Sequence, residues 1–112
     1  SGQGDGFSEI KSYLESLLNL SSLPIKFDLG DNYPNPFNPI TFIPFSLAEN
    51  SLVSINIFDL KGKLLHKFMS NKKYNKGYHK VKFNADDLPS GLYFYSITTN
   101  NWGKTKKMML VK

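Results

Sequence analysis

The sequence predicts an all-β fold, an antiparallel β-sandwich of about seven strands preceded by a short amphipathic helix. From residue 40 onward, apolar and polar residues alternate in short runs, the period expected of strands with one buried face. Turn sequences rich in Asn, Asp and Gly separate these runs. Most of the nine Phe and six Tyr fall within the runs, as aromatic residues do in β-sheets.

The chain of 112 residues suffices for one core and is too short for two. We divide it into a flexible N-terminus with a linker helix, residues 1–23, and a β-module, residues 24–112. The helix is predicted from an apolar stripe at helical spacing, formed by Ile10, Tyr13, Leu14, Leu17 and Leu18. It is either a linker, or the tail of an upstream domain that docks on the β-module, or a segment that binds a partner or self-associates through its stripe.

The alternating runs predict strands at residues 41–47, 53–58, 64–69, 79–83, 92–98 and 104–111. Asp59–Gly62 fits a hairpin turn, with Asp at its first position and Gly at its fourth. Asn71–Gly77 is predicted to be a polar loop, and Asn100–Gly103 a further turn. Pro44 places the first run at a sheet edge, because proline has no N–H for a ladder hydrogen bond.

Residues 33–39 hold three prolines and two asparagines, and we expect a rigid, non-helical segment. A surface with a preset shape suits recognition by a receptor. A structural role, in which the segment is an entry loop and Phe37 closes one end of the core, is favoured over recognition, and both roles can hold together. The candidate recognition residues here are Pro34, Asn35, Pro36, Phe37, Asn38 and Pro39.

Leu88–Tyr93 is typical of the corner that introduces a late strand in immunoglobulin-like sandwiches. In such corners a tyrosine hydroxyl bonds to the backbone a few residues upstream. Gly91 would permit the turn and Tyr93 would close it. The corner therefore predicts an immunoglobulin-like topology.

Charge is distributed unevenly along the chain. Residues 1–60 contain two Lys and seven acidic residues, a net of −5, whereas residues 61–112 contain twelve Lys and two Asp, a net of +10. This asymmetry indicates either a polyanionic partner or lysines that protect exposed strands from aggregation. Arg, the usual residue for bidentate phosphate and base recognition, is absent, so no nucleic-acid partner is expected.

No catalytic residue, metal site or cofactor is expected. The chain has no Cys, which excludes thiolate metal ligation and disulfides. His66 and His79 lie on different predicted strands, and the Asp86–Asp87 pair reads as a capped turn. Asp5–Gly6 lacks the flanking carboxylates of a calcium loop. No apolar run approaches the roughly 18 residues of a membrane span.

Five elements in order make the chain resemble the type A form of the type IX secretion system C-terminal sorting domain, which is similar to the immunoglobulin-like domain of the flagellar hook-capping protein. The resemblance extends over residues 29–112, about three quarters of the chain. The elements are Tyr33–Pro39, Val53–Gly62, Gly77–Val81, Leu88–Tyr93 and Lys106–Lys112.

The resemblance implies a sandwich at the C-terminus of a secreted or cell-surface cargo protein. The cargo crosses the inner membrane and folds in the periplasm, and an outer-membrane translocon recognises the domain. A sortase-like cysteine protease then removes the domain, near residues 21–30, and joins the cargo to anionic lipopolysaccharide, while other cargo is released. The departures are Lys63 or Lys67, where the family often has Arg, the unusual Pro44, and the helix at 8–20, which lies outside the family pattern.

We therefore expect two recognition surfaces. One is the Pro34–Pro39 segment. The other is the last strand, Lys104–Lys112, near an edge where a partner strand can add; its candidate residues are Lys106, Lys107, Val111 and Lys112. Gly91, Tyr93, Asp59 and Gly62 are assigned to the architecture.

Two other functions stay open. The first is an accessory carbohydrate-binding module, which requires exposed aromatic residues on one sheet face, with Phe42, Phe58 and Trp102 as candidates. The second is a structural or adhesion domain like that of the hook cap, which would lie inside a chain.

Overall fold

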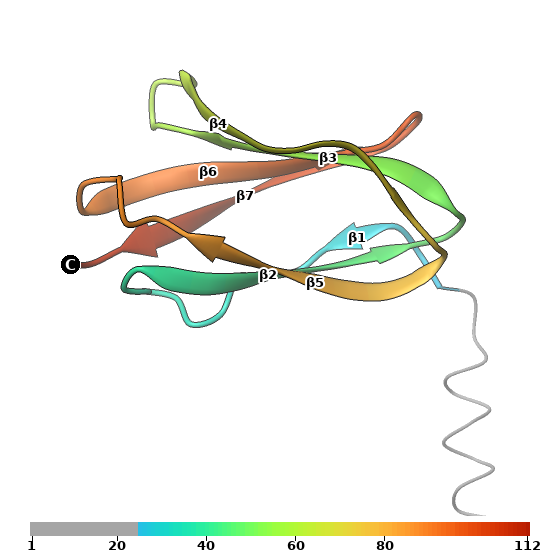
Figure 1. Ribbon diagram of the computed structural model, residues 1–112, viewed down its shortest axis with the longest axis horizontal. Coiled ribbons are helices and arrows are strands. Elements are labelled where there is room, and N and C mark those ends of the chain that lie inside the picture. The colour runs from blue at the N-terminus through green and yellow to red at the C-terminus, as the bar shows by residue number, and fades with distance from the viewer. Residues whose placement is uncertain (1–24) are drawn as a thin grey trace, which may run out of the picture.

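The computed structural model describes residues 25–112, which form seven strands in two antiparallel sheets (Figure 1). A three-stranded sheet has the order β1-β2-β5, and a four-stranded sheet has the order β4-β3-β6-β7. The predicted immunoglobulin-like sandwich is confirmed, while the helix predicted within residues 1–23 lies outside the described residues. The strands are β1 (Asp28–Leu29), β2 (Ile40–Leu47), β3 (Ser51–Phe58), β4 (Leu64–Tyr74), β5 (Gly77–Asn84), β6 (Gly91–Thr98) and β7 (Gly103–Leu110).

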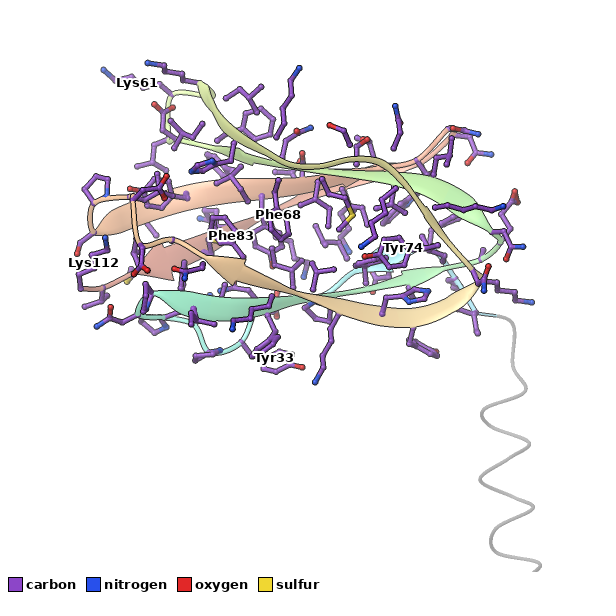
Figure 2. The ribbon with its side chains drawn as sticks, viewed as in Figure 1. Tyr33, Lys61, Phe68, Tyr74, Phe83 and Lys112 are labelled. Atoms are coloured by element: carbon purple, nitrogen blue, oxygen red, sulfur yellow. The ribbon has the colours of Figure 1, made fainter. Side chains whose placement is uncertain are left out.

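The core lies between the two sheets and consists of the inward-facing residues of the alternating runs. Burial of each large apolar side chain contributes roughly 1.5–3 kcal/mol. Phe68 of β4 and Phe83 of β5 meet edge to face across the interior, with ring centroids 5.4 Å apart (Figure 2). The fully buried residues include Ile43 and Leu47 of β2, Val53, Ile55 and Ile57 of β3, and Tyr95 and Ile97 of β6.

Two predicted turns are confirmed in detail. In the β3–β4 hairpin, the Gly62 N–H donates to the Asp59 carbonyl at 3.0 Å, and Gly62 has a φ of +84° that favours glycine. The Asp59 carboxylate accepts the N–H groups of Lys61 and Lys63, both at 2.9 Å. Before β6, the Tyr93 hydroxyl donates to the Pro89 carbonyl, which is the tyrosine corner that the sequence predicts.

The prediction of a polar loop at residues 71–77 is wrong, because β4 continues through Tyr74. β4 is the outermost strand of its sheet, and its register against β3 shifts three times. At the irregularity, Asn71 has a φ of +47° and its N–H donates to Ser54 Oγ at 3.0 Å. An exposed edge strand buries few side chains on either face, so its sequence is polar and lacks the alternation that distinguishes a strand from a loop.

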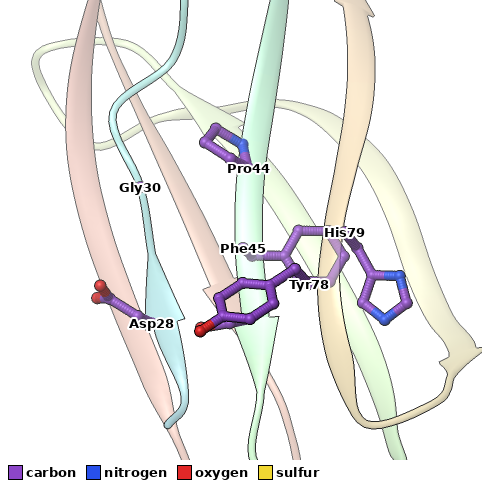
Figure 3. Close-up of a pocket in the computed structure, with 7 residues that line it drawn as sticks. Asp28, Gly30, Pro44, Phe45, Tyr78 and His79 are labelled. Atoms are coloured by element: carbon purple, nitrogen blue, oxygen red, sulfur yellow. The ribbon is translucent and has the colours of Figure 1, made fainter. Parts of the chain in front are cut away.

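Pro44 does not mark an edge strand, since β2 lies between β1 and β5. The Gly30 N–H donates to the Pro44 carbonyl at 2.8 Å. In an antiparallel strand the N–H and the carbonyl of one residue point to the same side, so the N–H that proline lacks would also point toward Gly30, which directly follows β1 (Figure 3). Tyr95 supplies the substitute donor, because its hydroxyl bonds the Gly30 carbonyl at 2.8 Å. A Cβ at position 30 would lie 2.8 Å from Pro44 Cγ, so the close approach requires glycine.

Candidate functional site

The proline-rich segment and the end of β7, predicted as two surfaces, form one. The Phe37 N–H donates to the Met109 carbonyl and the Val111 N–H donates to the Phe37 carbonyl, both at 2.9 Å. The Asn35 side-chain oxygen accepts the Met109 N–H at 3.0 Å. We call residues 34–39 together with 107–112 the loop–strand surface.

The candidates within residues 34–39 divide into a buried anchor and exposed neighbours. Phe37 is only 2% exposed and belongs to the core, so its side chain is not available to a partner. The side chains of Pro34, Asn35, Pro36 and Asn38 are exposed, and Pro39 is half-buried. The Tyr33–Pro34, Asn35–Pro36 and Asn38–Pro39 peptide bonds are cis. A partner that contacts this segment therefore meets the exposed side chains around Phe37.

A buried polar network holds the base of this segment. Asn32, 3% exposed, donates its backbone N–H to the Tyr95 hydroxyl at 2.9 Å and its side-chain amide to Thr41 Oγ at 3.0 Å. Thr41 Oγ in turn donates to the Pro34 carbonyl at 3.0 Å. Burial raises the pKa of Tyr95 to about 12, so its hydroxyl remains a neutral donor. No sequence pattern predicts this network, because Asn32 and Tyr95 are 63 residues apart and no local motif joins them.

The corner before β6 holds the end of the chain in place. The Lys112 N–H donates to Ser90 Oγ at 2.9 Å, and Lys112 Nζ donates to the Asp86 carbonyl at 2.5 Å. Gly91 is the register partner of Leu110 on β7. The structure thus places Gly91 and Tyr93 directly beside the loop–strand surface.

The lysines of β7 lie in two environments. Lys104 and Lys106 form ion pairs with Asp28 and Asp31, each at 2.8 Å. The hydrogen bond from Lys104 holds the pKa of Asp28 below its usual value. Lys107 points to the opposite face of the sheet and makes no ion pair with any residue in 25–112. Of these lysines, Lys107 is therefore the charge best placed to meet a partner.

The middle of β7 presents open backbone groups. The N–H and the carbonyl of Met109 point away from β6 and bond residues 35 and 37. Because backbone groups alternate in direction along a strand, the N–H and carbonyl groups of Lys107 and Thr105 also point away from β6. Among the described residues no backbone partner covers these two positions. β7 is the outermost strand of its sheet. Its C-terminal end is hydrogen-bonded to the loop, whereas the backbone groups of Thr105 and Lys107 are open to hydrogen bonding, with Asp28 and Asp31 nearby through their ion pairs with Lys104 and Lys106.

The two histidines lie in separate surroundings, and His79 Nε2 is 2.7 Å from the Asn75 carbonyl oxygen. His66 Nε2 lies 3.2 Å from an Asp87 carboxylate oxygen, a contact between β4 and the β5–β6 connection that the sequence did not predict. No hydroxyl within residues 25–112 hydrogen-bonds to His66, whereas nucleophilic catalysis needs nucleophile and base together. The Asp86 N–H donates to Asn84 Oδ1 at 3.0 Å, as expected for a capped turn. In the same part of the chain no three metal-ligating side chains gather.

The three aromatic residues considered for carbohydrate binding do not share a face. Phe42 lies on the outer face of the three-stranded sheet and Phe58 on that of the four-stranded sheet. Trp102 is half-buried and stacks on Phe27, with ring centroids 5.5 Å apart. Beside Phe42 the structure instead places Tyr33, in a stack with ring centroids 5.8 Å apart, and the exposed Tyr78 lies on the same outer face, near Pro44 (Figure 3).

Comparisons with known proteins agree with this geometry. A family model described as the secretion system C-terminal sorting domain matches residues 31–112. A search of curated proteins found no match. The matched span contains β2 to β7, the proline-rich segment and the tyrosine corner. No helix within residues 25–112 has the length and apolar character needed to cross a membrane.

Proposed function

The chain belongs to the family of type IX secretion system C-terminal sorting domains, and we propose that residues 24–112 are a non-catalytic signal that directs a larger cargo protein across the bacterial outer membrane. The family is one of secretion signals, which implies recognition by the type IX machinery and a secreted or cell-surface protein. The proposal adds that recognition uses the loop–strand surface.

The contact between the Pro34–Pro39 segment and the end of β7 supports this proposal. Two backbone hydrogen bonds, from the Phe37 N–H to the Met109 carbonyl and from the Val111 N–H to the Phe37 carbonyl, fix the segment against β7. A third bond runs from the Met109 N–H to the side-chain oxygen of Asn35. A receptor that binds a surface already held in place orders few side chains and loses little conformational entropy. The exposed backbone groups of Thr105 and Lys107 continue the same surface along β7 and offer main-chain hydrogen bonds to a partner.

The proposed route follows the family. The cargo enters the periplasm and folds, an outer-membrane translocon binds this domain, and a sortase-like protease cleaves before it and anchors or releases the cargo. Leu29 is fully buried and the Lys26 carbonyl accepts Ser46 Oγ at 2.6 Å. Because a protease needs exposed, unpaired backbone, we narrow the proposed cleavage region from 21–30 to 21–25.

A reporter protein fused upstream of residue 24 tests the sorting function in a bacterium with a type IX system. We expect the reporter outside the cells in that strain and inside them in a strain without the translocon. Circular dichroism of the purified fusion verifies that the domain is folded. A folded domain whose reporter stays inside the translocon-containing strain contradicts the proposal.

Carbohydrate binding remains the second candidate function, and the stacked Tyr33 and Phe42 with the exposed Tyr78 favour it. Aromatic faces on a sheet bind sugar rings through apolar contact. A glycan array separates the two functions, because saturable binding that Tyr78→Ala removes would support the carbohydrate module. Binding to no glycan, together with export of the reporter, would support the sorting signal.

A further inference from the structure

The outer face of the four-stranded sheet carries an apolar band at one end. Register pairs place Leu64 opposite Phe58, Phe58 opposite Phe94, and Leu92 opposite Met109. Leu64, Leu92 and Met109 are 40%, 37% and 39% exposed, and both Phe rings are partly exposed. We call these five residues, drawn from all four strands, the apolar band. A contiguous exposed apolar surface of this kind commonly marks an interaction site.

The band ends in a surface depression next to the proline-rich segment. Pro36 and Asn35 line one side, Leu92 and Met109 supply apolar surface, and Lys107 lines it as well. A second depression beside it is lined by Phe94, Thr105 and Lys107, with Asp31 and Lys106. Both depressions therefore adjoin the open middle of β7.

Lys106, Lys107 and Asp31 carry the charge around these depressions, and Asp31 is paired with Lys106. The outward positions of β3, β6 and β7 include no carboxylate, and Lys107 is the charged residue among them. The positions are Leu52, Ser54, Asn56, Phe58, Leu92, Phe94, Ser96, Thr98, Gly103, Thr105, Lys107 and Met109. An apolar surface next to one uncompensated ammonium is complementary to an apolar group with a nearby anion.

We propose that the depression between Pro36 and Lys107 is the anchoring pocket for a receptor segment in extended conformation, which carries a large apolar side chain and a carboxylate two residues away. This inference rests on the proposed function and specifies the chemistry of its partner. The segment pairs with the open backbone of Thr105 and Lys107 by strand addition. Residues two apart in a strand face the same way, so the apolar group fills the depression while the carboxylate meets Lys107.

A second copy of this chain fits the surface less well than such a segment. Pairing of β7 with β7 about a two-fold axis would bring the lysines of one strand against those of the other. Like charges opposite one another destabilise a pair of strands. An acidic and apolar segment places opposite charge at the same positions.

Matched glutamine substitutions test the pocket in the cell. Leu92→Gln and Met109→Gln change the depression, while Leu52→Gln changes an equally exposed leucine, 43% exposed, on the same outer face. Leu52 pairs with Lys73, next to Tyr74 and away from the end that holds Lys112 (Figure 2). We expect export of the reporter to fall about tenfold or more for the first two variants, as for the loss of a binding hot spot, and to stay within about twofold for Leu52→Gln.

Peptide binding to the full 112-residue chain tests the chemistry directly. The probes are two short peptides, one of alternating leucine and glutamate and one of alternating leucine and lysine, titrated while amide chemical shifts are followed. We expect the acidic peptide to bind about tenfold more tightly or better, with the largest shifts at Thr105, Lys107 and Met109. Lys107→Glu should reverse the preference between the peptides.

The outcomes distinguish the inference from the function on which it rests. Wild-type export of the Leu92→Gln and Met109→Gln variants, or an acidic-peptide preference unchanged by Lys107→Glu, overturns the pocket and leaves the sorting function standing. Failure of the unmodified domain to export the reporter contradicts the sorting function. The peptide titration then tests by itself whether the pocket binds an acidic and apolar segment. Binding of anionic lipid vesicles that needs Leu92, without peptide binding, would overturn the peptide as occupant.

Discussion

Tyr95 connects the core to the loop–strand surface through a single hydroxyl. The hydroxyl accepts the Asn32 N–H and donates to the Gly30 carbonyl. These two backbone groups lie on either side of Asp31, where the chain has left β1 and its pairing with β2 and continues toward residues 33–39. The side chain of Tyr95 is fully buried, and its bond with the Asn32 N–H is buried as well.

Tyr95→Phe should lower the free energy of unfolding by roughly 1–4 kcal/mol, because it leaves the buried Asn32 N–H and the partly buried Gly30 carbonyl without the Tyr95 hydroxyl. Urea denaturation measures this change. Tyr78→Phe is the matched control, since Tyr78 is 78% exposed and should change the stability by less than about 0.5 kcal/mol. Equal effects of the two substitutions would contradict the role assigned to Tyr95.

The same hydroxyl predicts a loss of stability at high pH. Burial raises the pKa of Tyr95 to about 12 from 10.0, so the folded protein retains the proton more tightly than the unfolded chain does. The stabilisation is complete below pH 10 and is lost as the pH rises through about 12. The loss is roughly 2–3 kcal/mol. Unfolding free energies in this range should decline less steeply for Tyr95→Phe, a comparison in which the lysine titrations cancel.

At the level of elements, the proline-rich segment and β7 hold each other through Asn35. Its side chain accepts the Met109 N–H, whereas Asn38, also exposed and also followed by proline, makes no side-chain hydrogen bond within residues 25–112. The two asparagines are both followed by proline and have different structural roles. They therefore provide a matched pair of substitutions.

Asn35→Ala should cost about 1 kcal/mol of stability, the typical contribution of one hydrogen bond, and should reduce export of a reporter. Asn38→Ala should leave the unfolding free energy within about 0.5 kcal/mol of the wild type. Chemical denaturation and the secretion assay measure both variants. A larger loss of stability for Asn38→Ala than for Asn35→Ala would show that the segment is held differently.

Deletion of residues 107–112 should abolish cooperative unfolding, because it removes Met108 and Leu110, each 1% exposed, and losses of such core residues cost roughly 2–5 kcal/mol apiece. Loss of export by this truncation would thus report misfolding. Removal of Lys112 alone deletes two exposed hydrogen bonds and should preserve a cooperative melt. We expect reduced export from this shorter truncation, and wild-type export would remove Lys112 from the recognition surface.

At the level of the whole molecule, residues 24–112 should fold as an independent unit. Among residues 25–112, sixteen buried residues form one core cluster that extends from Leu29 to Leu110 and draws on both sheets. A fragment of residues 25–112 should therefore melt within a few degrees of the full chain. A decrease of about 4–8 °C would correspond to a lost stabilisation of about 1 kcal/mol and would show that residues 1–24 dock on the sandwich. Calorimetry of the two proteins makes the comparison.

Local sequence alone determined most of the strands, two of the turns and the inward residues of the alternating runs. The alternation of apolar and polar residues placed Val53, Ile55 and Ile57 in the core. The Asp59–Gly62 and Leu88–Tyr93 motifs are held by hydrogen bonds between residues close in sequence, so they can be predicted without knowledge of the fold. The ordered motifs also indicated the family, which the match over residues 31–112 confirms.

Only the tertiary structure decided which distant elements meet. Asn35 bonds Met109 across 74 positions and Asn32 bonds Tyr95 across 63, and sequence patterns extend over a few residues only. The packing of β1 and β2 likewise decided that Pro44 lies in an interior strand, because Tyr95 supplies the donor that proline lacks. Contacts of this kind depend on how two sheets pack face to face, and they join the two predicted recognition surfaces into one.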